Sequence, residues 1–117
     1  MISIERLTVL LEKTQEIAKE AGAFIRKERQ HFNMDNVEHK GFNDLVSYVD
    51  KEAEKIIVDR LSKILPEAGF ITEEGTNTTK AEEFNWVIDP LDGTTNFIHG
   101  VPIFCVSIAL MERDEVI

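Results

Sequence analysis

Cysteine is nearly absent from this sequence of 117 residues, which contains Cys105 and no other. A single thiol excludes a disulfide within the chain and any cysteine cluster around a metal ion. Because small extracellular domains commonly depend on disulfides, we expect a cytoplasmic protein. Cys105 lies in an apolar stretch without basic neighbours, so we expect it to be a small, unreactive core residue.

Long hydrophobic runs are missing too. No apolar stretch approaches the roughly 20 residues of a membrane-spanning helix. The N-terminal segment has acidic residues in its first turns and no cleavage site of small residues, which is not typical of a signal peptide. Basic residues are outnumbered, 13 against 22 acidic ones, for a net charge of −9. We therefore expect neither a nucleic acid polymer nor a membrane as a partner. The acidity suits a site that collects divalent cations.

Two segments repeat apolar residues at steps of three and four, which predicts helices with one buried face. The first covers residues 7–25, with Ser3 as its predicted N-cap. The second covers residues 49–65 and is expected to begin somewhere within 44–50, which contains a Ser-x-x-Asp capping pattern. The polar stretch 30–43 is expected to form a loop.

Apolar runs after the second helix predict strands at 69–72, 84–88 and 103–111. A turn is expected at 113–115, with 116–117 as the first residues of a returning strand. The fold class is therefore α+β, with two helices packed on a largely antiparallel sheet. A chain that stops two residues into a strand leaves an open sheet edge. We accordingly expect residues 1–117 to be the N-terminal portion of a longer domain.

The residues that indicate chemistry follow the second predicted strand. Asp89 ends that strand, and Pro90 is expected to bend the chain so that Asp92 returns to the same side. Two carboxylates so placed can bind Mg²⁺ together with water and a substrate phosphate. Residues 93–95 offer backbone N–H groups at a predicted helix start, which favours phosphate binding, and the Thr94 hydroxyl could orient a water molecule. This combination indicates metal-assisted hydrolysis of a phosphate ester.

Three other known motifs do not match this sequence. An EF-hand counted from Asp89 would need oxygen ligands where the sequence has Leu91, Gly93 and Gly100. The nucleophile position of haloacid dehalogenase-like phosphatases is occupied by Pro90, which cannot attack. No P-loop pattern occurs.

The sequence closely resembles the inositol monophosphatase family. Asp89-Pro-Leu-Asp-Gly-Thr-Thr-Asn-Phe97 matches the family signature without a gap, and two further segments agree, Asp44-Leu-Val-Ser-Tyr-Val-Asp50 and Phe70-Ile-Thr-Glu-Glu74. The resemblance implies Mg²⁺-dependent, lithium-sensitive hydrolysis of phosphate monoesters. It also implies that residues 1–117 form the N-terminal part of a layered αβαβα fold, usually a homodimer, whose C-terminal half this sequence lacks.

The resemblance also assigns roles to individual residues. The implied metal ligands are Glu73, Asp89, the backbone carbonyl of Leu91, and Asp92. The implied catalytic residues, which position and deprotonate the attacking water, are Asp44, Glu73 and Thr94. Substrate contacts are implied for Glu73, Leu91, Asp92, Gly93 and Thr94, with the Gly93 and Thr94 N–H groups on the phosphate. Lys40 lies in the loop where family members carry a lysine near the metal-bound waters.

The end of the motif bears on the substrate. Thr95-Asn96-Phe97 is the form found in inositol phosphatases, which favours inositol monophosphate or a similar polyol phosphate. The alternative is a 3′(2′),5′-bisphosphate nucleotidase of the same superfamily. The family's remaining aspartate ligand and most of its sugar-binding residues lie in the missing half. We therefore predict that this segment alone is inactive, and a fragment that binds cations or phosphate without catalysis stays an alternative.

Overall fold

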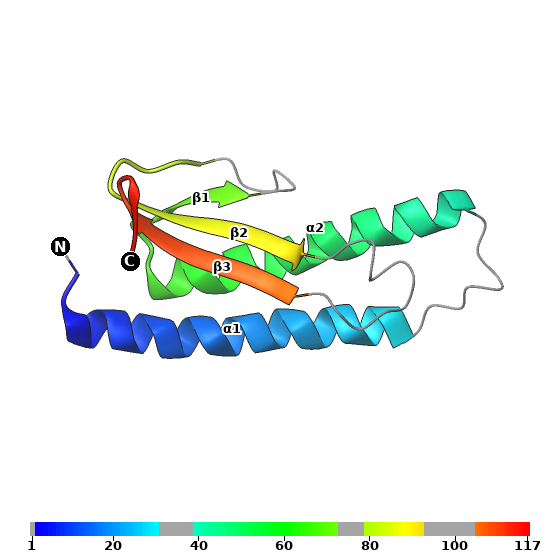
Figure 1. Cartoon of the computed structure of the whole chain (residues 1–117), viewed down its shortest axis with the longest axis horizontal. Coiled ribbons are helices and arrows are strands. Elements are labelled where there is room, and N and C mark those ends of the chain that lie inside the picture. The colour runs from blue at the N-terminus through cyan, green and yellow to red at the C-terminus, as the bar shows by residue number, and fades with distance from the viewer. Residues whose placement is uncertain (1, 31–38, 73–78, 93–104) are drawn as a thin grey trace.

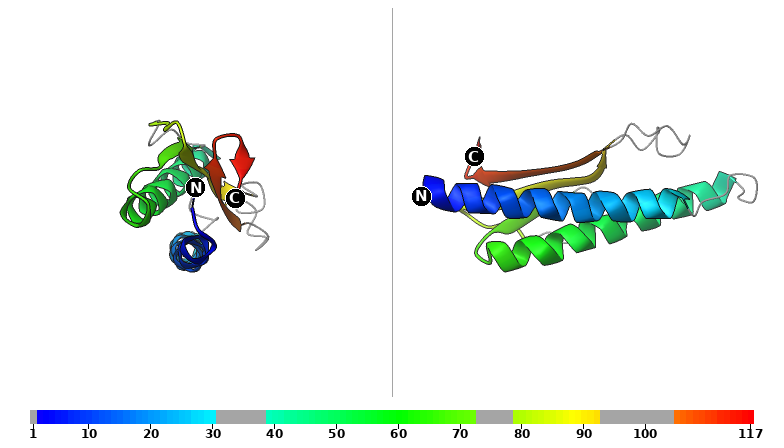
Figure 2. Two further views of the ribbon diagram at one scale, coloured as in Figure 1. Left: turned by 90° about the vertical axis from the view of Figure 1, so that its left-hand side faces the viewer. Right: turned by 90° about the horizontal axis from the view of Figure 1, so that it is seen from below.

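The computed structural model describes residues 2–30, 39–72, 79–92 and 105–117; the side chains of 29, 30, 39–47 and 92 lie outside that description. Within these ranges the elements in chain order are α1 (Ile4–Gln30), α2 (His39–Ile64), β1 (Gly69–Thr72), β2 (Phe84–Asp92), β3 (Cys105–Glu112) and β4 (Glu115–Val116). Both helices lie on one face of the sheet, α2 against β2 and α1 against β3 (Figures 1 and 2). The predicted α+β class is confirmed.

Helix α1 begins where its cap predicts. The Ser3 hydroxyl accepts a hydrogen bond from the Arg6 N–H at 3.2 Å, and the Ser3 carbonyl accepts one from the Leu7 N–H at 2.9 Å. These bonds satisfy donors that the first helical turn leaves without partners. Leu10, Ile17, Ala21 and Ile25 of the apolar stripe are buried, whereas Leu11 is 58% exposed. Neither helix among the described residues contains an apolar stretch long enough to cross a membrane.

Helix α2 begins earlier than predicted. Its first residue is His39, so the expected loop at 39–43 and the capping pattern at 44–50 both lie inside the helix. Helix propensity and capping patterns are weak local preferences that tertiary contacts override. The first described side chains of α2 already face α1. The Tyr48 ring meets Phe24 edge-on with ring centroids 6.4 Å apart, and Val49 is fully buried.

The four strands form one mixed sheet in the order β1-β2-β3-β4. β1 runs parallel to β2, with Phe70 opposite Trp86 and Thr72 opposite Ile88. β2–β3 and β3–β4 are antiparallel, as predicted for most of the sheet. β1 has its predicted bounds, whereas β2 continues beyond its predicted end at residue 88. Because β1 and β2 are parallel, their C-terminal ends lie at the same edge.

The main core lies between the helices and the sheet. Helix α2 contributes Ile57 and Leu61, which are fully buried, and burial of each of these side chains stabilises the fold by about 1.5–3 kcal/mol. Trp86 is 2% exposed and sits in the same cluster. The buried members from α2, from Leu65 just after it and from the strands are Ile57, Leu61, Leu65, Phe70, Phe84, Trp86, Ile88 and Leu110.

Cys105 is exposed, so its prediction as a core residue is wrong. Along β3, Val106, Ile108 and Leu110 pack against the helices. Alternate residues of a strand face opposite sides of the sheet, so Cys105 and Ser107 face away from the helices. Both are exposed. A continuous apolar run in the sequence therefore corresponds to a strand that buries one face.

The hairpin between β3 and β4 confirms the predicted turn. Arg113 has a φ of 56°, in the left-handed region that tight hairpin turns require. Its N–H donates to the Glu83 carbonyl at 2.6 Å, which ties the turn to the segment before β2. Beyond the turn, the Ile117 N–H donates to the Leu110 carbonyl at 2.9 Å.

Candidate active site at the ends of two parallel strands

The candidate site lies where β1 and β2 end. The last residue of β1, Thr72, is paired with Ile88 of β2. Asp89 follows Ile88 on β2 and is paired with Ser107 of β3. Glu73 follows Thr72 in the sequence but lies outside the described residues.

Asp89 is held in place by its own strand. Its side chain is partly buried, and its Oδ1 accepts a hydrogen bond from the Leu91 N–H at 3.3 Å. This bond, from a carboxylate to the N–H two residues later, is the Asx-turn type that fixes an aspartate at the end of an element. An ionised carboxylate offers about four lone-pair positions, and this bond uses one of them. The group can therefore also bind a cation.

The path of the backbone between Asp89 and Asp92 differs from the prediction. The strand does not end in a bend at Pro90 but continues through it to Asp92. Asp89 is opposite Ser107 and Asp92 is opposite Cys105, so three steps along β2 correspond to two along β3. The extra residue makes a β-bulge. Proline has no N–H to donate, which explains why the strand tolerates it at this irregularity.

A second buried cluster anchors this strand end to both helices. Leu91 is 3% exposed and packs with Ile25 of α1 and with Val49 and Ala53 of α2. Pro90 is also fully buried. Since both residues between Asp89 and Asp92 are packed into the interior, the backbone that carries the two aspartates is firmly held.

The N-terminal part of α2 lies at the same end of the molecule as the C-terminal end of β2 (Figure 1). The contact of Val49 and Ala53 with Leu91 establishes this proximity. Asp44 lies five residues before Val49 in this part of the helix. Lys40 also lies in α2, not in the predicted loop. The side chains of Asp44 and Lys40 are outside the described residues.

The remaining predicted site residues lie outside the description. Gly93 and Thr94 belong to the segment 93–104, and for Asp92 only the backbone at the end of β2 is described. Among the described side chains, no group of three or more histidine, cysteine, aspartate or glutamate residues could hold a metal ion.

Two buried polar residues were not predicted from the sequence, one on β2 and one on α2. Asn85, 3% exposed, donates from Nδ2 to the Ala81 carbonyl at 2.7 Å and accepts from the Ala81 N–H at 2.8 Å. Glu54 on α2 is fully buried. It lies three residues before Ile57 and seven before Leu61, so an acid on the apolar stripe is the signal that could have found it.

Comparison with known proteins agrees with this arrangement. The family model for the inositol monophosphatase family matches residues 6–117. The chain belongs to the inositol monophosphatase family. Inositol monophosphatase 3 of Solanum lycopersicum is 45% identical over 104 residues, covering 86% of this chain and 38% of that protein. The fructose-1,6-bisphosphatase/inositol-1-monophosphatase of Thermotoga maritima is 46% identical over 84 residues, covering 71% of this chain and 32% of that protein.

Solved structures of the family share the fold. The extragenic suppressor protein suhB of Bartonella henselae superimposes with a TM-score of 0.77 at 35% identity, over 93% of this chain and 41% of that one. The inositol monophosphatase of Thermotoga maritima gives a TM-score of 0.72 at 36% identity, over 91% of this chain and 41% of that one. The chain thus spans about 40% of the length of the relatives that it matches.

Proposed function

We propose that this chain provides the metal- and phosphate-binding strand ends of a Mg²⁺-dependent phosphomonoesterase. The observation that carries the proposal is the meeting of the C-terminal ends of β1 and β2, where Asp89 stands on a bulged strand. Glu73 follows β1 directly in the sequence. In a regular strand, residues three apart face opposite sides; one extra residue reverses that relation, which supports a shared side for Asp89 and Asp92.

The donor chemistry fits Mg²⁺. Carboxylates of Glu73, Asp89 and Asp92 and the Leu91 backbone carbonyl are all oxygen donors, which this hard cation prefers. Asp89, the described carboxylate of the set, is partly buried and oriented by the Leu91 N–H. When bound, Mg²⁺ would lower the pKa of a water molecule and neutralise charge on the phosphate.

The chain's own residues would then perform in-line hydrolysis without a phosphorylated enzyme intermediate. The Gly93 and Thr94 N–H groups would hold the phosphate. The Thr94 hydroxyl, with Asp44 and Glu73, would orient the attacking water and accept its proton. Asp44 lies on α2 about one and a half turns before Val49 and about two and a half turns before Ala53, which both contact Leu91, and this position supports the grouping.

We propose inositol monophosphate or a similar polyol phosphate as the substrate. The names of several relatives and the Thr95-Asn96-Phe97 ending support this class. A nucleotide substrate is the second candidate, because a related staphylococcal inositol monophosphatase is described with bound 2′-AMP at 31% identity and a TM-score of 0.72. Lithium sensitivity, a homodimeric state and a cytoplasmic location stay predictions.

Metal binding tests the site in the chain as it is. Mg²⁺ titrated into the chain should bind weakly, and Asp89→Asn should weaken binding at least about tenfold, since a charged ligand becomes neutral. Asp59→Asn is the matched control, because Asp59 is an exposed aspartate on α2 that pairs with Lys63 and Arg60. Equal affinity of the Asp89 variant and the unchanged chain would contradict the assignment.

Activity tests the reaction and the substrate class. The chain alone should release no phosphate from inositol 1-phosphate in Mg²⁺, and turnover there would refute the predicted inactivity. A chimera in which this chain replaces the matching part of the Thermotoga maritima relative should be active and should lose that activity with Asp89→Asn. Faster release from adenosine 3′,5′-bisphosphate than from inositol 1-phosphate would favour the nucleotidase.

A further inference from the structure

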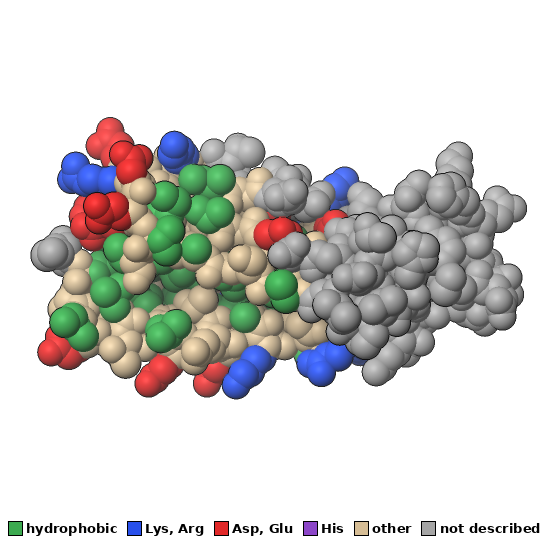
Figure 3. Space-filling view, viewed as in Figure 1, with side chains coloured by type: hydrophobic (Ala, Val, Ile, Leu, Met, Phe, Trp, Pro, Cys, Tyr) green, Lys and Arg blue, Asp and Glu red, His purple; other side chains and the backbone are tan. Residues whose placement is uncertain are grey.

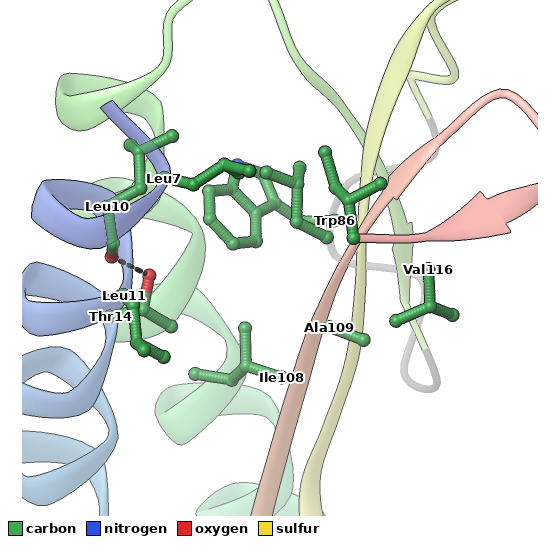
Figure 4. A pocket seen from close by; sticks show the side chains of 10 residues that line it. Leu7, Leu10, Leu11, Thr14, Trp86, Ile108, Ala109 and Val116 are labelled. Carbon is green, nitrogen blue, oxygen red and sulfur yellow. Dashed lines mark hydrogen bonds between the residues drawn. The ribbon is translucent and has the colours of Figure 1, made fainter. Parts of the chain in front are cut away.

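Glu54 is the only acid that is fully buried among the side chains that the structure describes. Other acidic side chains appear at the surface of the molecule, as in the face that Figure 3 shows. Elsewhere the interior between α1 and the sheet is apolar, lined by Leu10, Trp86 and Ile108, and the Thr14 hydroxyl there donates to the Leu10 carbonyl at 2.6 Å (Figure 4). A carboxylate loses its hydration when it is buried, so the position of Glu54 is costly unless hydrogen bonds compensate.

Helix geometry places Glu54 on a side of α2 that faces away from α1. Arg60 marks the side towards α1, because its Nη2 pairs with Glu20 of α1 at 3.0 Å. Glu54 is turned by about 120° from Arg60, since the two are six residues apart. Seven residues make nearly two full turns, so Glu54 lies in line with Leu61, which is fully buried in the main core. Glu54 thus faces the sheet.

Along the helix, Glu54 is level with the end of β2. The preceding residue, Ala53, packs against Leu91 near the end of that strand. Across the molecule, α1 packs against β3 and α2 against β2, and β1 lies on the other side of β2 from β3 (Figures 1 and 2). The side of α2 that faces away from α1 is therefore the side of β1. Glu54 lies beneath the edge at which β1 and β2 both end.

Glu54 and the candidate metal-binding aspartate approach this edge from opposite faces of the sheet. Trp86 and Ile88 of β2 belong to the core beside the helices. Successive residues of a strand face opposite sides, so Asp89 faces away from the helices. Glu54 on the helix side can therefore hold the backbone that carries Asp89, but it is not placed to share a cation with it.

We propose that Glu54 is a positioning residue for the candidate site. Its carboxylate accepts hydrogen bonds from N–H or O–H donors where the chain leaves β1 and β2, and so fixes the backbone from which Asp89 and Leu91 present their oxygen atoms. This inference rests on the proposed function, which gives the fixed strand end its purpose. An apolar side chain at this position would pack in the core but could not accept such bonds, which explains why the apolar stripe of α2 is interrupted here.

Two substitutions separate the length of the Glu54 side chain from its charge. Glu54→Gln keeps the length and removes the charge, whereas Glu54→Asp keeps the charge and withdraws the carboxylate by one methylene group. Glu52→Gln is the matched control, because Glu52 lies on the same helix, is partly exposed and pairs with Lys55 at 3.3 Å. Far-ultraviolet circular dichroism first establishes that each variant is folded.

Backbone hydrogen exchange in the absence of metal reports on the strand end. The Leu91 N–H, which donates to Asp89 Oδ1, should exchange about tenfold faster or more in both Glu54 variants. The Trp86 N–H, in the interior of β2, should change little, and neither group should change in Glu52→Gln. Unchanged exchange at Leu91 would overturn the proposal. Equal acceleration at Leu91 and Trp86 would also overturn it, because it would show a loss of overall stability only.

The Mg²⁺ affinity of the folded chain reports on the site itself. Both Glu54 variants should bind Mg²⁺ about tenfold more weakly, while Glu52→Gln should match the unchanged chain. Unchanged affinity in both Glu54 variants would overturn the positioning role. Weaker binding by Glu54→Gln alone would overturn it as well, because the charge would then act at a distance. If the unchanged chain binds no Mg²⁺, the proposed function fails, and exchange at Leu91 by itself decides whether Glu54 holds the strand end.

Discussion

Gly69, the first residue of β1, is the position at which a single methyl group should be most damaging. A Cβ there would lie 2.5 Å from the Asn85 Oδ1 and 2.6 Å from the Thr79 carbonyl oxygen, and closer still to the Ala81 nitrogen. Carbon atoms do not approach such atoms within 3.0 Å, so strand or loop must move. We predict that Gly69→Ala strongly destabilises the chain.

The magnitude follows from the bonds at risk. The side chain of Asn85 makes two hydrogen bonds to the Ala81 backbone, at 2.7 and 2.8 Å, and the Phe70 N–H donates to the Thr79 carbonyl at 2.7 Å. Each buried polar group left without its partner costs about 1–3 kcal/mol. Loss of one or two of these bonds, with some strain in the remainder, should lower the free energy of unfolding by about 2–4 kcal/mol.

The same substitution elsewhere provides the control. Gly22 lies within α1, and a methyl group added there would meet no neighbouring element within 4 Å among the described residues. Gly22→Ala should therefore stabilise by about 0.5–1 kcal/mol, because glycine is a poor helix former. Urea unfolding followed by far-ultraviolet circular dichroism measures both variants. Opposite signs are expected, and a Gly69→Ala chain as stable as the parent would refute the packing argument.

Two further predictions concern the helix face and an ion pair. Leu61→Ala should lower the free energy of unfolding by about 2–4 kcal/mol, because Leu61 is fully buried, whereas Leu11→Ala should change it by under about 1 kcal/mol; similar losses in urea titrations would contradict the burial pattern. The pKa of Glu67 lies below its ordinary value of 4.5 because its backbone amide and Arg6 stabilise the carboxylate. The stabilisation by this carboxylate is therefore present above pH 4.5 and lost on acidification. Glu67→Gln should lower the free energy of unfolding by at most about 0.5 kcal/mol near pH 6, since the pair is half exposed, and by progressively less towards pH 3. A loss of stability in Glu67→Gln that grew as the pH fell would contradict this prediction.

Much of the fold could be predicted because its signals are local. The apolar period of α1 and the Ser3 cap located that helix, and the short run at residues 69–72 located β1. Predictions failed where distant contacts decide. Helix α2 begins at His39, and further along it Tyr48 packs on Phe24 of α1. A capping pattern does not reveal such a contact between two helices. The exposure of Cys105 depends on which face of β3 the helices cover.

For the candidate site, the sequence showed the residue types but not their arrangement in space. A motif of carboxylates, glycine and threonine indicates metal and phosphate chemistry because few other patterns supply those donors together. How Asp89 relates to Asp92 depends on the bulge, since the pairing with Ser107 and Cys105 inserts one extra residue. The spacing of two residues in the sequence does not reveal how many residues of the paired strand lie opposite them.

The sequence by itself determined which donor side chains are present and where most of the local elements lie. Side-chain types are given by the sequence directly, and helical or strand periodicity is a property of residues close together in the chain. The tertiary structure alone decided that β1 runs parallel to β2, so that two strand ends meet at one edge. It also decided that Leu91 is anchored against both helices. These features arise from contacts between residues far apart in the chain, where free energy depends on packing and register and not on local preference.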